Sequence, residues 1–341
     1  MFLTGKNIRK GLLLLSLAMM VFITSCAEML TGQPTVKMDV PPPQTPQLQT
    51  FQTSGEYLKA GKASFDIQRF DEAQAYLSDA VRLDQENQAA HLLLGVTYVK
   101  LGKGAEARRE FDKAVQIDAK TGDAETAKSW LKRLNNPLGV GILPVKQSWL
   151  IRFSPVADNE AQLQWKAGKI TQFYNTYFPN IEQIYYRTLS KILSDCGFYS
   201  IIDFYGAEPV EWKHESTAEK TPPFMGIPMA AVVIKSINTA KLNNKSNIAN
   251  FKHTNAKIIL IGDIDLIVEE KTLFHGGIYW YNISINPTVR LYSIKDLKLI
   301  KDISDKIIME KVKKDNLKDT MNQAFEKLFQ KMALEIHNAL L

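Results

Sequence analysis

Two carboxylates separated by one residue are the side chains in this sequence whose types and spacing most suggest chemistry. Asp263 and Asp265 alternate along a predicted strand, so both are expected to point to one side of a sheet. Such a pair could bind a cation or share a proton. The alternative is a pair of solvent-facing or loop-capping carboxylates with no chemical task.

The histidines offer no second site. They are scattered and never lie four residues apart on one helix face, so no metal cluster is predicted. His91 and His337 fall on predicted helices and His214, His253 and His275 in predicted loops, and we expect each to be solvated. The sequence also lacks a phosphate-binding glycine loop and a Gly-x-Ser-x-Gly motif. We therefore expect no catalytic, cofactor-binding or metal-binding residues, and a protein that is not an enzyme.

Composition describes an ordinary folded protein. The chain has 341 residues, of which 45% are hydrophobic and 23% charged, which fits about two domains. Two cysteines are too few for a disulfide framework. Cys196 lies on the apolar face of a predicted helix and is expected to be a buried structural thiol.

The first 25 residues have the pattern of a secretory signal. Basic residues at 6, 9 and 10 precede an apolar run over 12–23, and no acidic residue occurs before Glu28. The run is shorter than the ~20 residues that a bilayer-crossing helix needs. Removing residues 1–25 lowers the formal net charge from +6 to +3, because this segment holds three basic residues and no acidic ones. So small a surplus, with no basic cluster, predicts no nucleic-acid binding.

The end of this segment, Ile23-Thr24-Ser25-Cys26, resembles the lipobox of bacterial lipoproteins. The resemblance implies cleavage between Ser25 and Cys26, and attachment of fatty chains such as palmitate to the Cys26 thiol and the new amine. The alternatives are a plain signal peptide or an uncleaved N-terminal anchor. The resemblance places the protein in the bacterial cell envelope, anchored to a membrane without spanning it. Ala27 stands where an aspartate would favour inner-membrane retention, which favours the outer membrane, facing the periplasm.

Residues 26–53 are predicted to be a disordered tether, because they combine five prolines with many Gln and Thr. A helical pattern with a 34-residue period follows over residues 54–136, and it resembles the tetratricopeptide repeat (TPR). The resemblance implies packing between and within helical hairpins by Gly61, Ala73, Leu77, Ala80, Gly95, Tyr98, Ala107, Phe111 and Ala114.

The repeat departs from its family in places. Ser64 and Gly104 replace usual aromatics, and a third unit from Asp123 ends at Asn135-Asn136-Pro137, which predicts a capping helix. Stacked hairpins of this kind present a surface for peptides or partner domains. The alternative is a rigid spacer or a lid on the second domain.

Residues 139–341 are predicted to form an α/β sandwich with a mixed sheet, so the fold class is α + α/β. We expect helices near 159–173, 181–196 and 228–240 and a closing helix near 317–340. Strands are expected at 139–145, 198–204, 256–268, 279–291 and 297–309. Residues 206–225 and 241–254 are expected to be exposed loops.

The order of these elements resembles a group of periplasmic lipoproteins that includes the curli-secretion lipoprotein (CsgG) and the activators of penicillin-binding proteins (LpoB). The phrases that carry the resemblance are Val140-Gly141-Ile142-Leu143-Pro144, Gly197-Phe198-Tyr199-Ser200-Ile201-Ile202, the strand over 255–265 and the turn over 294–300. They describe a fold and contain no chemical site.

The first hypothesis is a non-catalytic, lipid-anchored scaffold or adaptor that docks other envelope proteins or cell-wall machinery. The second, which the CsgG resemblance suggests, is a component of an outer-membrane export or assembly apparatus, in which the chain could form homo-oligomers. The third is an enzyme acting on wall polymers, for which only Asp263 and Asp265 speak.

Overall fold

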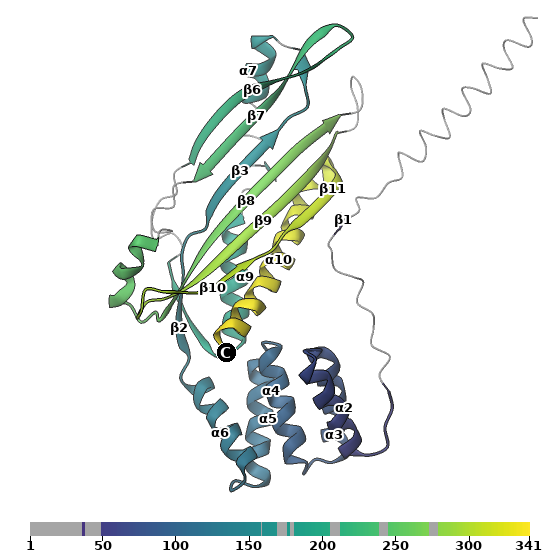
Figure 1. Ribbon diagram of the computed structural model, residues 1–341, viewed down its shortest axis with the longest axis vertical. Coiled ribbons are helices and arrows are strands. Elements are labelled where there is room, and N and C mark those ends of the chain that lie inside the picture. Colours follow the sequence, from purple (N-terminus) through teal and green to yellow (C-terminus); the bar gives the residue numbers. More distant parts are fainter. Residues whose placement is uncertain are drawn as a thin grey trace, which may run out of the picture.

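The computed structural model describes residues 36–37, 49–157, 159–168, 176–177, 181–204, 212–238, 245–272 and 279–341. Five helices come first, and a strand-rich domain with a mixed sheet follows (Figure 1). The predicted fold class is therefore confirmed. The signal segment, Cys26 and most of the predicted tether lie outside the described residues, apart from a two-residue strand, β1 (Val36–Lys37).

The five helices form three layers: two antiparallel helical hairpins, α2–α3 and α4–α5, and the single helix α6. We call these layers the repeat unit (residues 54–135). Thr53, Asn87 and Thr121 cap the first helix of each layer, each accepting a hydrogen bond from a backbone N–H in the first turn. These three caps are spaced by 34 residues, which is the period of the sequence. The helices are α2 (Ser54–Asp66), α3 (Phe70–Leu83), α4 (Gln88–Lys100), α5 (Gly104–Ile117) and α6 (Gly122–Asn135).

Two long antiparallel strands, β8 and β9, form the centre of the sheet. β8 pairs in parallel with β2 at its beginning and with β3 further along, while β9 pairs with β11 at its beginning and β10 at its end. The central order is β1-β11-β9-β8-β3-β7-β4, with β6 on β7 and β5 on β2. The strands are β2 (Leu138–Ile142), β3 (Lys146–Arg152), β4 (Val156–Ala157), β5 (Tyr199–Asp203), β6 (Trp212–Phe224), β7 (Ile227–Asn238), β8 (Ile258–Thr272), β9 (Tyr279–Ser293), β10 (Leu299–Ser304) and β11 (Ile307–Lys313).

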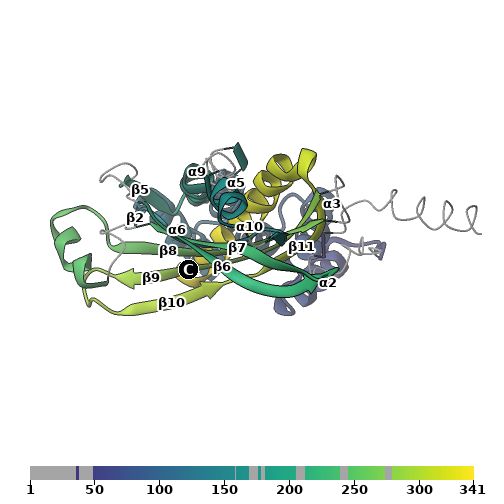
Figure 2. The same ribbon diagram turned by 90° about the horizontal axis from the view of Figure 1, so that it is seen from above.

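Two helices, α9 (Ile181–Asp195) and α10 (Leu317–Leu340), cover one face of this sheet (Figure 2). Side chains alternate along each strand, so the covered face of β8 is apolar and buried at Ile264, Leu266 and Val268. Asp263 and Asp265, which alternate with these residues along β8, lie on the opposite face. The short helix α7 (Glu160–Gly168) lies against β4 and β7, within the region where a helix was expected.

The repeat unit and the sheet domain share one hydrophobic core. Val99, Phe111 and Leu134 of the repeat unit belong to the same buried cluster as α9, α10 and the covered face of the sheet. The contact lies between the C-terminal end of α10 and the helix ends of α4, α5 and α6 (Figure 1). The two parts are therefore packed together, which fits a repeat unit that serves as a rigid spacer or a lid on the sheet domain. The same packing is also compatible with a repeat unit that binds peptides or partner domains.

The expected elements over residues 206–240 are wrong. Residues 212–224 form β6 instead of a loop, and residues 227–238 form β7 instead of a helix. β6 has no apolar alternation because, within the described residues, it pairs with β7 alone and nearly all of its side chains are exposed. β7 has a continuous apolar run, and periodicity cannot separate a buried strand from a buried helix in such a run.

Three smaller expectations also differ from the structure. Residues 245–253 form a 3-10 helix with Ile248 and Phe251 buried, not an exposed loop. The single strand expected over residues 297–309 is two strands, β10 and β11, which pair with different parts of β9. The sequence does not predict β3. Its buried positions are Gln147, Trp149 and Ile151, and the polar Gln147 hides the apolar alternation that would indicate a strand.

Candidate functional site

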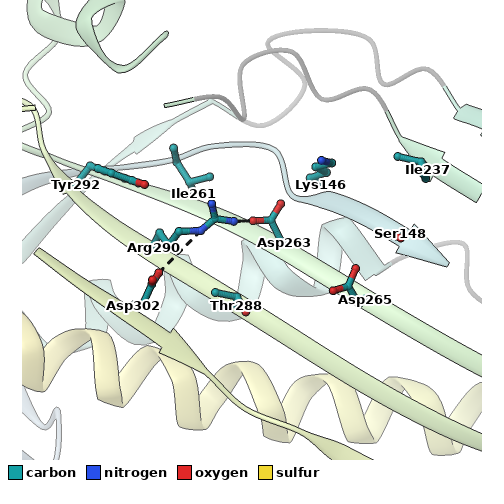
Figure 3. A pocket seen from close by; sticks show the side chains of 10 residues that line it. All are labelled: Lys146, Ser148, Ile237, Ile261, Asp263, Asp265, Thr288, Arg290, Tyr292 and Asp302. Carbon is teal, nitrogen blue, oxygen red and sulfur yellow. Dashed lines mark ion pairs between the residues drawn. The ribbon is translucent and has the colours of Figure 1, made fainter. Parts of the chain in front are cut away.

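The open face of the sheet carries the predicted carboxylate pair in a shallow depression of about 810 Å³. Lys146 of β3 lies opposite Asp263, and Ser148 lies opposite Asp265 in the parallel register of β3 and β8. On the other side Thr288 of β9 lies opposite Asp263. The depression is lined by Lys146, Ser148, Ile237, Ile261, Asp263, Asp265, Thr288, Arg290, Tyr292 and Asp302 (Figure 3).

An arginine occupies the space between carboxylates of the two strands on either side of it. Arg290 of β9 pairs with Asp263, and its Nε lies 3.9 Å from Oδ1 of Asp302 on β10 (Figure 3). Asp265 lies outside this group, away from the guanidinium (Figure 3). A carboxylate held by a guanidinium is poorly placed to share a proton with its neighbour. Asp263 and Asp265 therefore do not form a proton-sharing pair.

A cation site finds no support in these residues. Among the residues that the structure describes, no group of three or more His, Cys, Asp or Glu side chains could hold a metal ion. Asp263, Arg290 and Asp302 instead form a partly exposed network of opposite charges. Pairs of this kind stabilise a fold by at most about 1 kcal/mol each.

The structure contradicts the expected solvation of two histidines. His337 of α10 is fully buried and His91 of α4 is 8% exposed. His91 was expected on the solvent side, but Glu110 of α5 lies beside it, with Oε2 2.7 Å from Nδ1. His214 lies in a strand and is hydrogen-bonded to Ser236 of β7, at 2.7 Å. His253 is exposed, and His275 lies outside the described residues.

His337 joins the sheet domain to the repeat unit. Its Nε2 donates to the carbonyl of Val99, the last but one residue of α4, at 2.5 Å, and the Tyr199 hydroxyl lies 2.9 Å from its Nδ1. These partners suit a neutral ring, in which Nδ1 accepts. Burial lowers the pKa of His337, and the nearby Lys100 and Arg133 lower it further. Sequence periodicity cannot reveal this role, because the partners come from α4 and β5.

We expect His337 to make the fold sensitive to acid. Because its pKa is lower in the folded state than the unfolded value near 6.5, the folded state loses stability as pH falls below 6.5. Between pH 7.5 and 5.5, wild type should lose up to about 1.4 kcal/mol more unfolding free energy than His337→Gln, by urea titration. His91→Gln is the control: Glu110 raises the pKa of His91, so its contribution is lost as pH rises. Equal pH slopes in wild type and His337→Gln would contradict the assignment.

The residues predicted to pack the repeats lie between the helices. A Cβ on Gly61 would come 2.6 Å from Leu77 Cγ, and one on Gly95 would come 2.6 Å from the Phe111 ring, so each glycine lies in close contact with the second helix of its hairpin. Fully buried positions are Ala73, Leu77, Ala80, Ala107, Phe111 and Ala114, while Tyr98 is partly exposed and packs against the core.

Sequence reasoning missed a ladder of hydrogen bonds that also repeats every 34 residues. Ser54 donates to the carbonyl of Ala80, and Gln88 donates to the carbonyl of Ala114. The caps Asn87 and Thr121 in turn bond to Ser54 and Gln88, at 2.9 and 2.8 Å. The signal was present in the sequence, since polar residues recur at the cap position of all three layers and at the next position of the first two. These bonds hold the first helices of successive layers side by side.

Residues 65–134 match the tetratricopeptide repeat family model. The matched range runs from the end of α2 through the penultimate residue of α6. A search of curated proteins found no match to the chain. Repeats of this family suggest a protein–protein interaction adaptor, and they are typically non-catalytic modules.

The structure describes one of the two cysteines. Cys196 is buried, as expected, and burial raises the pKa of its thiol to about 12. Cys26 and Ser25, the predicted lipidation and cleavage residues, lie outside the described part of the chain. In the ranges that the structure covers, no helix is both long and apolar enough to cross a membrane.

Proposed function

We propose that this protein is a non-catalytic adaptor of the bacterial cell envelope, anchored by acyl chains on Cys26 and docking other envelope proteins through its repeat unit. The observation that carries the proposal is the tetratricopeptide match over residues 65–134. The secretory pattern of residues 1–25 and the lipobox-like Ile23-Thr24-Ser25-Cys26 support the location. The outer membrane, with the folded part facing the periplasm, is the proposed site.

The docking face is argued from the layering of the repeat unit. The hydrogen-bond ladder holds α2, α4 and α6 side by side, with α3 and α5 behind them. α4 has no charged residue between His91 and Lys100, and its Leu92 and Val96, one turn apart, pack against the core while remaining partly exposed. The exposed part of such apolar side chains provides an anchor for an apolar partner segment.

A crosslinking experiment tests this function. Tagged protein is crosslinked in intact envelopes and purified, and wild type should recover a specific set of partner proteins. Leu92→Glu should lose them, because it places a charge on the α4 face. The matched control is Leu83→Glu, which makes the same change at an exposed leucine at the end of α3 and should retain them. Thermal unfolding establishes that both variants fold. Recovery of no specific partner, or equal recovery by both variants, counts against the proposal.

The second candidate is a component of an outer-membrane export or assembly apparatus. The resemblance of residues 139–341 to the curli-secretion and penicillin-binding-protein-activator lipoproteins favours it. Native mass spectrometry separates the two candidates, because a ring of several copies supports the apparatus and a strict monomer supports the adaptor. A wall-degrading enzyme lacks a comparable basis, since Asp263 is held by Arg290.

A further inference from the structure

The turn of the β6–β7 hairpin presents a continuous apolar surface to solvent. Every residue from 222 to 228, Pro-Pro-Phe-Met-Gly-Ile-Pro, is exposed. Met225 is 86% exposed, Ile227 53% and Phe224 47%. No charged residue occurs from 221 to 234. We call residues 222–228 the hairpin tip.

The turn itself does not require apolar side chains. Met225 and Gly226 have positive φ angles of 50° and 78°, the backbone of a two-residue turn that Asn-Gly or Asp-Gly forms readily. The rest of β6 is polar, with Lys213 to Lys220 all exposed. Consecutive exposed apolar residues at a turn therefore indicate a contact that the described chain does not supply.

A large aromatic side chain lies in the same region. β4 pairs with Met229 and Ala230, next to the tip, and α7 lies against β4 and β7. Trp165 of α7 is 59% exposed. Tryptophan is enriched where proteins meet the headgroup layer of a bilayer.

Strand directions place the tip at the end of the sheet that the first residue of β1 faces. β1 is antiparallel to β11, so Val36 is the end of β1 that lies toward the edge where β8 finishes and β7 begins. Met309, opposite Val36, lies in the same row of the sheet as Ile234, seven residues from Ile227. Measured from Val36, the tip is thus about 23 Å further along the strand direction and about five strand spacings of ~4.8 Å across the sheet.

The chain between Cys26 and Val36 is long enough for Cys26 and the hairpin tip to reach the same surface. Nine residues lie between Cys26 and Val36, and the ten residue-to-residue steps can span at most about 35 Å. That reach is about the distance from Val36 to the tip. A lipid anchor at Cys26 and the hairpin tip can therefore touch the same membrane at once.

We propose that the hairpin tip inserts into the interfacial layer of the membrane that carries the anchor, with Phe224, Met225 and Ile227 in contact with acyl chains. This inference rests on the proposed lipid anchor. Insertion is shallow, because β6 becomes charged at Lys220. Two contacts with one surface make the second intramolecular, so a weak tip suffices to orient the protein.

The test separates the tip from the anchor. The chain from residue 26, with Cys26→Ser and an N-terminal histidine tag, is held on phosphatidylethanolamine–phosphatidylglycerol vesicles that contain a nickel-chelating lipid. An environment-sensitive dye is attached at Met225→Cys, since Cys196 is buried and does not label. The matched control carries the dye at Glu215→Cys, an exposed position on β6 away from the turn. Because the tag replaces the acyl chains, the result does not depend on whether Cys26 is acylated in cells.

The expected result is a several-fold rise in dye fluorescence at position 225 on vesicles, quenched by lipids brominated in the acyl chains, with no change at position 215. Without nickel lipid, Phe224→Asp and Ile227→Asp should each reduce vesicle binding about tenfold. No change at position 225, or equal changes at both positions, overturns the proposal. A concentration-dependent change without vesicles overturns it too, since the tip would then dock a second copy.

Discussion

Cys26→Ser is expected to abolish both acylation and cleavage, so that the variant chain keeps residues 1–25 and carries no acyl groups. A single acyl chain binds a bilayer with a constant of only about 10⁴ M⁻¹, and a second or third chain makes the attachment stable. Losing the thiol removes the diacylglycerol and, with it, cleavage before residue 26. In a chain that is made to begin at residue 26 with Cys26→Ser, and so lacks both the signal segment and the acyl groups, membrane partitioning should fall by more than about 10⁴-fold relative to the acylated chain.

Fractionation of cells and the intact mass of the mature chain measure this effect. Cys196→Ser is the matched control, because it removes the other cysteine of the chain and should leave the protein in the membrane fraction. The wild-type chain should begin at Cys26 and carry the mass of its acyl groups. An unmodified mature mass, or a Cys26→Ser chain that is still cut before residue 26, would remove the basis of the envelope proposal.

Gly104→Ala is expected to separate the repeat unit from the sheet domain. A Cβ on Gly104, the first residue of α5, would lie 2.2 Å from the Cys196 carbonyl oxygen and 2.6 Å from its carbonyl carbon. Backbone atoms at the end of α9 cannot rotate away as a side chain can. The overlap must push α5 off the sheet domain, at a cost of about 3 kcal/mol.

Gly122→Ala provides a matched control, because Gly122 is the first residue of α6 and nothing lies within 4 Å of its Cβ position. Alanine there should be neutral or stabilising by up to about 1 kcal/mol. In chains carrying Cys26→Ser, the thiol of Cys196 reports the docking directly. It is buried and its pKa is about 12, so it should resist a thiol reagent at pH 8 in wild type and Gly122→Ala. It should react faster in Gly104→Ala; equal rates and equal stabilities in the two variants would refute the role of this contact.

The local order of the sequence determined several parts of this fold. The 34-residue period placed the repeats, because each layer packs against a copy of itself and needs the same small and large residues at the same positions. The closing helix, now α10, and the long strands now called β8 and β9 were also predictable, since their apolar faces repeat over many residues. The placement of Asp263 and Asp265 on one side of the sheet followed from strand alternation alone.

Tertiary contacts decided the rest. β6 is polar and exposed, and only its pairing with β7 makes it a strand. His337 is buried because α10 ends against α4. Its hydrogen-bond partner there, Val99, lies 238 positions earlier in the sequence. Arg290 neutralises Asp263 through a diagonal across two strands, which no local spacing reveals. A sequence shows what each segment can bury along its own period, whereas the partners of a polar side chain depend on which segments the fold brings together.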